Sequence, residues 1–232
     1  MKIKFPHFHF VFLSVLAIFA LLPIPHAKAA TVVELVADLY QSPYGWMDSD
    51  PGHLAVFNNK LYFSATVGDD RELWVYDGIN APSLAADIEP NGWSEPQYLT
   101  AFNGALYFSA YTNDYGRELW KYDGVNAPSM VADINPDSNN SYPSYLTMFN
   151  SKLYFSAEDS NGDVELWVYD GVNPPNLVAD INPSYSSDPA YLAVFDNKLF
   201  FSAEGNDGMG QELWLYDGVN APSLRADIYS GG

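Results

Sequence analysis

The sequence Leu61-Tyr62-Phe63-Ser64-Ala65, followed by Glu72-Leu73-Trp74-Val75-Tyr76-Asp77-Gly78, decides the fold of this 232-residue chain because it occurs four times. The Glu-Leu-Trp triplet returns at Glu118–Trp120, Glu165–Trp167 and Glu212–Trp214, at spacings of 46, 47 and 47 residues. Each copy continues to Tyr-Asp-Gly and then to Ala-Asp-Ile. A fixed period of this length is typical of repeat architectures, and it takes precedence over local patterns in predicting the fold.

Each repeat divides into four short predicted strands. In the second repeat these are Tyr98–Phe102, Ala105–Tyr111, Glu118–Asp123 and Ser129–Ile134. The dipeptide Asn103-Gly104 favours a tight hairpin turn, because both central residues of that turn need positive φ. Aromatic residues fill the second strand, which is therefore expected at the centre of a sheet. The chain after residue 30 shows no helical period.

Four antiparallel strands in a unit of 46–47 residues predict an all-β fold, the blades of a β-propeller. The four repeats span approximately residues 51–88, 96–134, 143–181 and 189–228. Strands this short cannot bury their aromatic faces alone, so blades must stack on one another. A β-solenoid is the alternative, although solenoids use shorter coils with fewer hairpin turns.

One strand is left over. Residues 32–39 resemble the fourth strand of a blade but precede the first complete repeat. Three arrangements accommodate this spare strand: an extra edge on a four-bladed ring, a larger ring shared by two chains, or a piece of a longer array. The first is the preferred interpretation.

The Leu-Tyr-Phe-Ser-Ala, Glu-Leu-Trp, Asp-Gly and Ala-Asp-Ile elements together resemble the ELWxxDGT repeat of bacterial exported proteins. The resemblance covers nearly the whole chain after residue 30 and extends in layout to kelch and WD-repeat blades. It implies a propeller and an extracellular or envelope location, but no established activity and no functional residues. One departure concerns the Thr after Asp-Gly, which is replaced here by Ile79, Val125, Val172 and Val219.

The first 29 residues have the order of a secretory signal peptide: a basic start, the apolar run Phe10–Leu22, and Ala27-Lys28-Ala29. Cleavage is expected after Ala29 or Ala30, which leaves residues 30–232 as one β-propeller domain. A transmembrane anchor is the alternative, but this run of thirteen residues, interrupted by Ser14, rises only about 20 Å as a helix. We therefore expect a secreted or periplasmic protein with no membrane insertion of the mature chain. The chain has no cysteine for a lipoprotein anchor or a disulfide.

The charge is strongly acidic. The full chain carries a net charge of −19, and removal of the signal with its three lysines leaves seven basic and 29 acidic residues, a net of −22. Such a surface repels phosphate backbones and anionic lipids, so nucleic acid is not an expected partner.

The acids that recur in every repeat are expected to be structural. Glu72 begins the third strand of its repeat, Asp77 ends it, and Asp87 follows in the fourth. Glycoside cleavage needs two unlike carboxylates at one place, whereas these positions are equivalent in all four repeats. We expect them to accept backbone N–H bonds at turns. His53 takes a position that tyrosine occupies in the other repeats, so packing is its expected role.

One acidic turn suggests calcium. Asp159, Asn161 and Asp163 place oxygen atoms at alternate positions, as calcium loops do. The loop lacks the glycine and the closing glutamate of an EF-hand, and ordinary hairpin turns use the same residue types. A calcium ion at this loop is the one candidate cofactor; otherwise we expect none.

The loops between repeats differ most from one another, and they hold the candidate ligand-binding residues. Aromatic residues in these loops suit stacking on sugars or cationic groups, although they also suit packing beneath their own loops. The candidates are Tyr44, Trp46, Trp93, Tyr142 and Tyr185.

The sequence favours a non-catalytic binding or scaffolding propeller that recognises a glycan, a peptide or an envelope component through these loops. One alternative is an extracellular, glycosidase-like hydrolase with carboxylates at the channel mouth; a close pair of unlike acids among Asp48, Asp50, Glu89 and Glu95 would favour it. A second alternative is a structural surface or matrix protein that self-associates through the edge of the spare strand.

Overall fold

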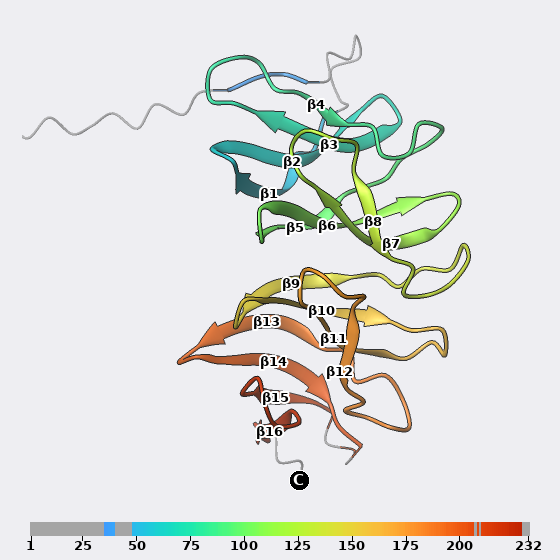
Figure 1. Cartoon of the computed structure of the whole chain (residues 1–232), viewed down its shortest axis with the longest axis vertical. Helices are drawn as coiled ribbons and strands as arrows, with labels where there is room; N and C mark the ends of the chain where they lie inside the picture. The colour runs from blue at the N-terminus through green and yellow to red at the C-terminus, as the bar shows by residue number, and fades with distance from the viewer. Residues whose placement is uncertain (1–34, 40–47, 207, 209, 229–232) are drawn as a thin grey trace, which may run out of the picture. The chain divides into compact units, whose positions relative to one another are not determined.

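The computed structural model describes residues 35–39, 48–206, 208 and 210–228, so the predicted signal peptide lies outside the described residues. The described part is all-β and forms four antiparallel sheets of four strands, the blades of a β-propeller, as predicted (Figure 1). Blade 1 contains β1 (Gly52–Phe57), β2 (Lys60–Val67), β3 (Asp70–Tyr76) and β4 (Ser83–Ala86); blade 2 contains β5 (Gln97–Phe102), β6 (Ala105–Thr112), β7 (Gly116–Tyr122) and β8 (Ser129–Ala132); blade 3 contains β9 (Ser144–Phe149), β10 (Lys152–Glu158), β11 (Val164–Tyr169) and β12 (Asn176–Ala179); blade 4 contains β13 (Ala190–Phe195), β14 (Lys198–Glu204), β15 (Gln211–Tyr216) and β16 (Ser223–Ala226). No helix in these ranges is long and apolar enough to cross a membrane.

Hairpin turns join the first two strands of each blade, and their chemistry is as the sequence predicts. Asn103 and Gly104 have φ values of 45° and 76°. The other three blades have positive φ at both turn positions without a glycine, using Asn, Asp and Ser instead. Asn and Asp tolerate this conformation better than most residues.

The repeated Asp-Gly dipeptide closes a turn after each third strand. Asp77 Oδ1 accepts hydrogen bonds from the backbone N–H groups of Ile79 and Asn80, both at 2.8 Å, and Oδ2 accepts one from the Asn80 amide. These bonds recur in all four blades. They lower the pKa of Asp77 to about 2, and the Asn80 side chain is the largest cause. This repeated acid is therefore a turn residue.

The fourth strand of each blade is shorter than predicted. In blade 2, β8 ends at Ala132, whereas the sequence predicts a strand through Ile134. The pairing of β7 and β8 shifts register between Leu119 and Trp120, and the Ile134 N–H then donates to the Glu118 carboxylate at 2.9 Å. The Glu118 carboxylate thus takes the place of a backbone acceptor, and the fourth strand ends here.

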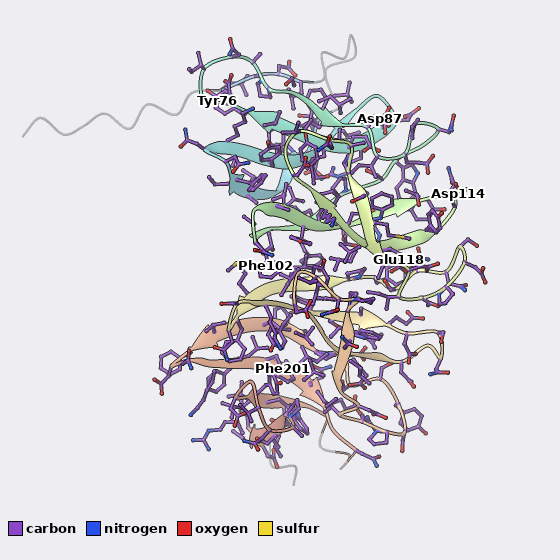
Figure 2. The ribbon with its side chains drawn as sticks, viewed as in Figure 1. Tyr76, Asp87, Phe102, Asp114, Glu118 and Phe201 are labelled. Carbon is purple, nitrogen blue, oxygen red and sulfur yellow. The ribbon has the colours of Figure 1, made fainter. Side chains whose placement is uncertain are left out.

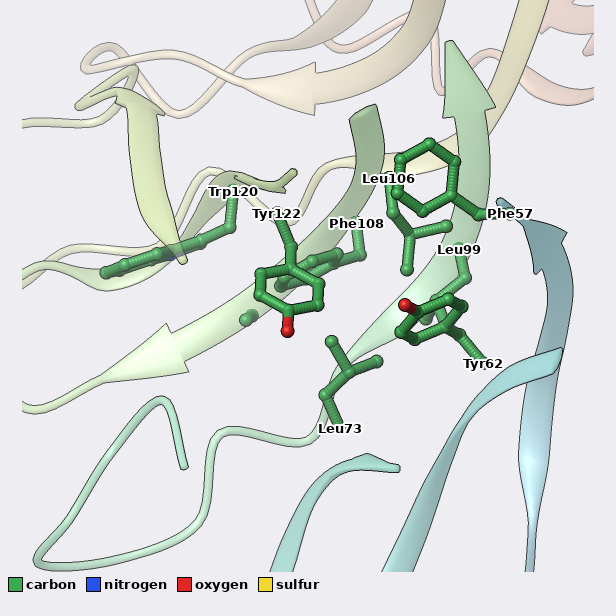
Figure 3. Close-up of a cluster of buried hydrophobic side chains, with 9 residues drawn as sticks. Phe57, Tyr62, Leu73, Leu99, Leu106, Phe108, Trp120 and Tyr122 are labelled. Atoms are coloured by element: carbon green, nitrogen blue, oxygen red, sulfur yellow. The ribbon is translucent and has the colours of Figure 1, made fainter. Parts of the chain in front are cut away.

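The core lies between blades rather than within them. We call the side of a blade that packs on the next blade its front face and the other side its back face. In Figure 3, Tyr62 and Leu73 from the front face of blade 1 pack with Leu106, Phe108 and other back-face residues of blade 2. Equivalent clusters join blades 2 and 3 and blades 3 and 4. Figure 2 labels Phe102 and Phe201, which belong to these two clusters.

A second device, which we call the Ser-x-Pro loop, also joins consecutive blades. The loop at Ser141 leads into blade 3: its N–H and Oγ–H donate to Glu118 of blade 2 at 3.1 and 2.7 Å. Its carbonyl accepts a 2.7 Å bond from Glu158 N–H of blade 3. Ser94 and Ser187 make the same bonds at the other two junctions. The repeated glutamate is therefore buried and structural, as expected.

Packing between blades follows chain order. The first strands of successive blades contact one another, β1 with β5, β5 with β9 and β9 with β13. Within the described ranges, no comparable packing joins β13 to β1. Of the predicted spare strand, residues 35–39 are described and pair with no strand of blade 1, whereas residues 32–34 lie outside the described residues. Residues 35–39 line an apolar groove with the back-face residues Leu54 and Leu61.

Candidate functional site

Four aromatic rings, one from the first strand of each blade, form a ladder that crosses the four blades. Each ring lies where the pairing with the second strand shifts register, a β-bulge that turns the side chain out of the strand pleat. The four residues have φ values of 54–57°, which is unusual for aromatic residues. They are His53, Tyr98, Tyr145 and Tyr191.

The rings are in contact from one blade to the next. Centroid distances are 5.5 Å for His53–Tyr98, 5.4 Å for Tyr98–Tyr145 and 5.2 Å for Tyr145–Tyr191, with tilted planes. The two middle rings are half-buried, whereas His53 and Tyr191 at the ends are exposed. The ladder is therefore a continuous aromatic surface across four blades.

Two arginine–carboxylate pairs lie near one end of the ladder. Arg71 pairs with Asp50 at 3.3 Å and also donates to Ser64 Oγ. Arg117 pairs with Glu95 at 2.6 Å. The arginine side chains are largely buried, whereas 78% of the Asp50 side chain is exposed. Blades 3 and 4 have Val164 and Gln211 at the arginine position, so the charged end is confined to blades 1 and 2.

His53 contacts the first strand of blade 2. Its Nδ1 accepts a 3.2 Å hydrogen bond from the Tyr98 N–H, which requires that nitrogen to be unprotonated. Partial burial lowers the pKa of His53, and Arg71 lowers it further, whereas the charges of Glu95 and Asp50 oppose this shift. The imidazole also packs on the Tyr98 ring, which is the role expected for it.

A shallow polar pocket of about 310 Å³ opens beside the two central rings. Ser109 contributes a buried hydroxyl with no hydrogen-bond partner in the described part of the chain, while its blade 1 counterpart, Ser64, accepts from Arg71. An unpaired buried hydroxyl is costly, and a ligand or water can satisfy it. The residues lining the pocket are Gln97, Tyr98, Ser109, Arg117, Tyr142, Pro143, Ser144 and Tyr145.

The predicted aromatic residues have different surroundings. Tyr142 lines the pocket and is half exposed. Trp93 stacks on Tyr111, with ring centroids 5.0 Å apart. Tyr185 is highly exposed but lines no pocket near the ladder. Tyr44 and Trp46 lie outside the described residues.

The predicted calcium loop is closed by its own hydrogen bonds. Asp159 Oδ1 accepts from the N–H groups of Asn161 and Asp163, at 2.7 and 3.2 Å. Among the described residues, no three His, Cys, Asp or Glu side chains are grouped to hold a metal ion. Calcium at this loop stays a prediction.

The four unlike acids named by the sequence separate into two groups. Glu89 is buried and accepts a 2.8 Å bond from the Asn113 N–H, which makes it a loop residue. Asp50 pairs with the Arg71 side chain, and the Arg71 carbonyl accepts a 2.9 Å bond from the Glu95 N–H. Asp48 is exposed, before the first strand. Asp50 and Glu95 therefore both lie on loops that contact Arg71, and each carboxylate is paired with an arginine.

Sequence reasoning missed the arginines and the ladder. One signal was present: Arg precedes Glu-Leu-Trp in two repeats of four, so that position varies whereas the triplet that follows it does not. The second signal was the aromatic residue repeated in the first strand. The direction of this aromatic side chain could not be predicted. In a regular strand it would point to the opposite face of the sheet, and the β-bulge changes that direction.

No family model matches this chain, and no curated protein matches it. Solved structures with a similar fold include Zg3597, a family 117 glycoside hydrolase of the marine bacterium Zobellia galactanivorans, at 14% identity over 76% of this chain and 68% of that chain, with a TM-score of 0.43. A thermostable family-43 glycoside hydrolase has 14% identity over 79% and 72%, with a TM-score of 0.41. The Pyrococcus horikoshii acylaminoacyl peptidase has 13% identity and a TM-score of 0.49, and the match covers 78% of this chain but 27% of that chain. At these identities the likeness is one of fold alone.

Proposed function

We propose that this protein binds a neutral carbohydrate along the aromatic ladder and in the adjoining pocket. The observation that carries the proposal is the juxtaposition of the Tyr98 and Tyr145 rings with Arg117 and the unpaired Ser109 hydroxyl. Sugar rings present apolar C–H faces and a rim of hydroxyl groups, so they match aromatic rings beside polar donors.

The charge of the chain argues for a neutral ligand. A net charge of −19 repels anionic sugars at long range. The ladder also extends over all four blades. A linear oligosaccharide uses such a surface better than a single sugar does.

The proposal is tested by a glycan array followed by calorimetry on the best ligand. We expect Tyr98→Ala and Tyr145→Ala each to weaken binding by about tenfold, the magnitude of one lost aromatic contact. Tyr115→Ala serves as the control, because Tyr115 is an exposed tyrosine in the turn between β6 and β7. Undiminished binding in a variant that combines Tyr98→Ala with Tyr145→Ala, with the fold intact by circular dichroism, would refute the site.

Glycoside hydrolysis is a second candidate, favoured by two unlike acids, Asp50 and Glu95, on loops that both contact Arg71. Cleavage needs one carboxyl group as a proton donor and another as base or nucleophile. Both are paired with arginine here, so substrate would have to release one of them. Release of reducing ends from the bound glycan, lost in Asp50→Asn and in Glu95→Gln, would favour catalysis. Binding without product would favour recognition alone.

We further propose that the protein is exported, with cleavage after Ala29 or Ala30, and that it belongs with the ELWxxDGT repeat proteins. The order of basic, apolar and small residues at the start of the chain supports export. Mass spectrometry of the mature protein after expression in a bacterial host tests it. A mature protein that retains residues 1–29 would contradict it.

A further inference from the structure

The front face of blade 4 is uncovered among the described residues. Phe195 is 72% exposed, whereas its counterparts Phe57, Phe102 and Phe149 are 6%, 5% and 3% exposed because the next blade covers them. The three covered faces show what this face binds: the back face of another blade of the same kind.

The back face of blade 1 is incompletely covered in the matching way. Leu54 is 58% exposed, whereas its counterparts Leu99 and Leu146 are each 8% exposed. The Asp-Gly turns show the same difference between a covered and an uncovered face. A Cβ on Gly218 would lie 3.3 Å from the Phe149 ring of the preceding blade, whereas a Cβ on Gly78 would meet nothing within 4 Å.

The open face of blade 4 contains an incomplete Ser-x-Pro junction. Glu212 is 6% exposed, and among the described residues its carboxylate accepts only from the Ile228 N–H. Its counterpart Glu118 accepts in addition from Ser141 of the next blade. A pocket of about 350 Å³ adjoins Glu212, lined also by Gln211 and Ile228. A buried carboxylate facing a pocket requires donors.

Blade 1 carries the missing half of this junction. Thr66 N–H donates to the Ser49 carbonyl at 2.8 Å, the same bond that fixes Ser94 and Ser141 in the loops of blades 2 and 3. The Ser-x-Pro loop at Ser49 is thus formed, but among the described residues no glutamate accepts from its N–H and O–H groups. Glu212 and Ser49 are complementary halves.

The two faces also match at a tyrosine contact. The Ala85 carbonyl of blade 1 accepts a hydrogen bond from Tyr122 of blade 2 at 3.4 Å. Arg225 occupies the position of Ala85 in blade 4, and Tyr76 occupies that of Tyr122 in blade 1. Docked in the same way, the Tyr76 hydroxyl would donate to the Arg225 carbonyl.

We propose that the front face of blade 4 docks on the back face of blade 1 in a second copy of this chain, with the partner's Ser49 entering the pocket beside Glu212. The contact repeats the interblade packing already present three times within the chain. Leu35–Leu39, which line the groove on the back face of blade 1, must move aside. The interface is heterologous, so it closes into a ring or continues as a chain of molecules.

Light scattering on purified protein over a range of concentrations tests the proposal. We expect wild-type mass to rise to at least twice that of one chain. Phe195→Glu and Leu54→Glu should each remain single chains, because both residues are exposed in the free chain and tolerate the change. Val125→Glu, an equally apolar and exposed site on the inner blade 2, is the control and should associate as wild type does.

Mixing the two variants gives the sharper result. Phe195→Glu keeps a sound blade 1 face and Leu54→Glu keeps a sound blade 4 face, so the mixture should form a dimer and stop there. A wild-type protein that stays a single chain up to its solubility limit would overturn the proposal. So would a mixture that remains single chains while wild type associates.

Two further variants test the details. Ser49→Ala removes a donor to Glu212 and should weaken association about tenfold, the effect of one hydrogen bond to a charged group. Unchanged association would overturn the Ser49–Glu212 contact.

The double change Val36→Asp with Leu39→Asp weakens the packing of Leu35–Leu39 on blade 1 and should strengthen association. Weaker association would show that these residues do not compete with the partner.

Discussion

Single residues in this protein owe their roles to position rather than to type. Asp77 is an exposed turn acceptor with a pKa of about 2, whereas burial raises the pKa of Glu118 to about 7. Both acids recur in every blade, yet neither faces the candidate site. The residues that do face it, Arg71 and Arg117, are the ones that change between repeats.

Glycine substitutions should separate backbone strain from packing. Gly104 and Gly116 have φ values of 76° and 66°, so alanine at either position costs about 1 kcal/mol in strain. A Cβ on Gly104 meets nothing, but one on Gly116 would lie 2.6 Å from the carbonyl carbon of Asn139. We expect Gly116→Ala to destabilise the protein by about 3 kcal/mol or more and Gly104→Ala by about 1 kcal/mol. Urea unfolding measures both, and equal losses would argue against the clash.

The structural element that defines this propeller is the junction between blades. Each junction combines an apolar cluster with a buried glutamate that receives donors from the following Ser-x-Pro loop. Figure 2 labels Glu118 where blade 2 meets the loop that leads to blade 3. The glutamate also ends the fourth strand early, through its bond to Ile134.

The junction predicts an unusual dependence of stability on pH. Burial is the main cause that raises the pKa of Glu118 from 4.5 to about 7, against the hydrogen bonds from Ser141, Ile134 and Asn135. Between these values the folded chain holds a proton that the unfolded chain has released, so the contribution of Glu118 to stability falls as pH rises through the window. The total is about 3 kcal/mol at most.

Glu118→Gln should therefore flatten the curve of unfolding free energy between pH 4.5 and 7. Chemical unfolding at several pH values gives this curve for both proteins. Asp114→Asn is the matched control, because Asp114 is an exposed acid in the turn between β6 and β7. A Glu118→Gln protein with the wild-type slope would contradict the raised pKa.

The strands were predictable because their pattern is local and recurs. The predicted strand Tyr98–Phe102 differs from β5 by one residue, and the turn at Asn103-Gly104 has the expected φ values. The site was less predictable, since the outward direction of Tyr98 depends on a bulge that no propensity encodes. The roles of the arginines could not be predicted, because their partner carboxylates come close to them only in the folded chain. Of the predicted loop aromatics, Tyr142 lines the same pocket as Arg117.

At the scale of the whole molecule, four blades pack in sequence order and leave two unlike end faces. Each interior blade is covered on both sides, whereas Phe195 and Leu54 at the ends are exposed. The chain also carries a net charge of −19, so two copies repel each other before these faces meet.

The proposed association should therefore strengthen with salt. Raising the ionic strength from about 0.01 M to about 0.1 M shortens the Debye length from about 30 Å to about 10 Å, which screens the repulsion but leaves apolar contacts intact. We expect sedimentation equilibrium to show tighter association at the higher salt. Weaker association with added salt would indicate that attraction between opposite charges dominates the interface.

The order of the junctions has a consequence for how the chain folds. The Ser-x-Pro loops at Ser94, Ser141 and Ser187 each bind the glutamate of the blade immediately before them, and within the described ranges no such junction joins blades distant in sequence. Folding therefore needs no long loop to close, and blade 1 with blade 2 suffices to start it. Each later blade then finds a finished surface to fold against as it emerges from the ribosome.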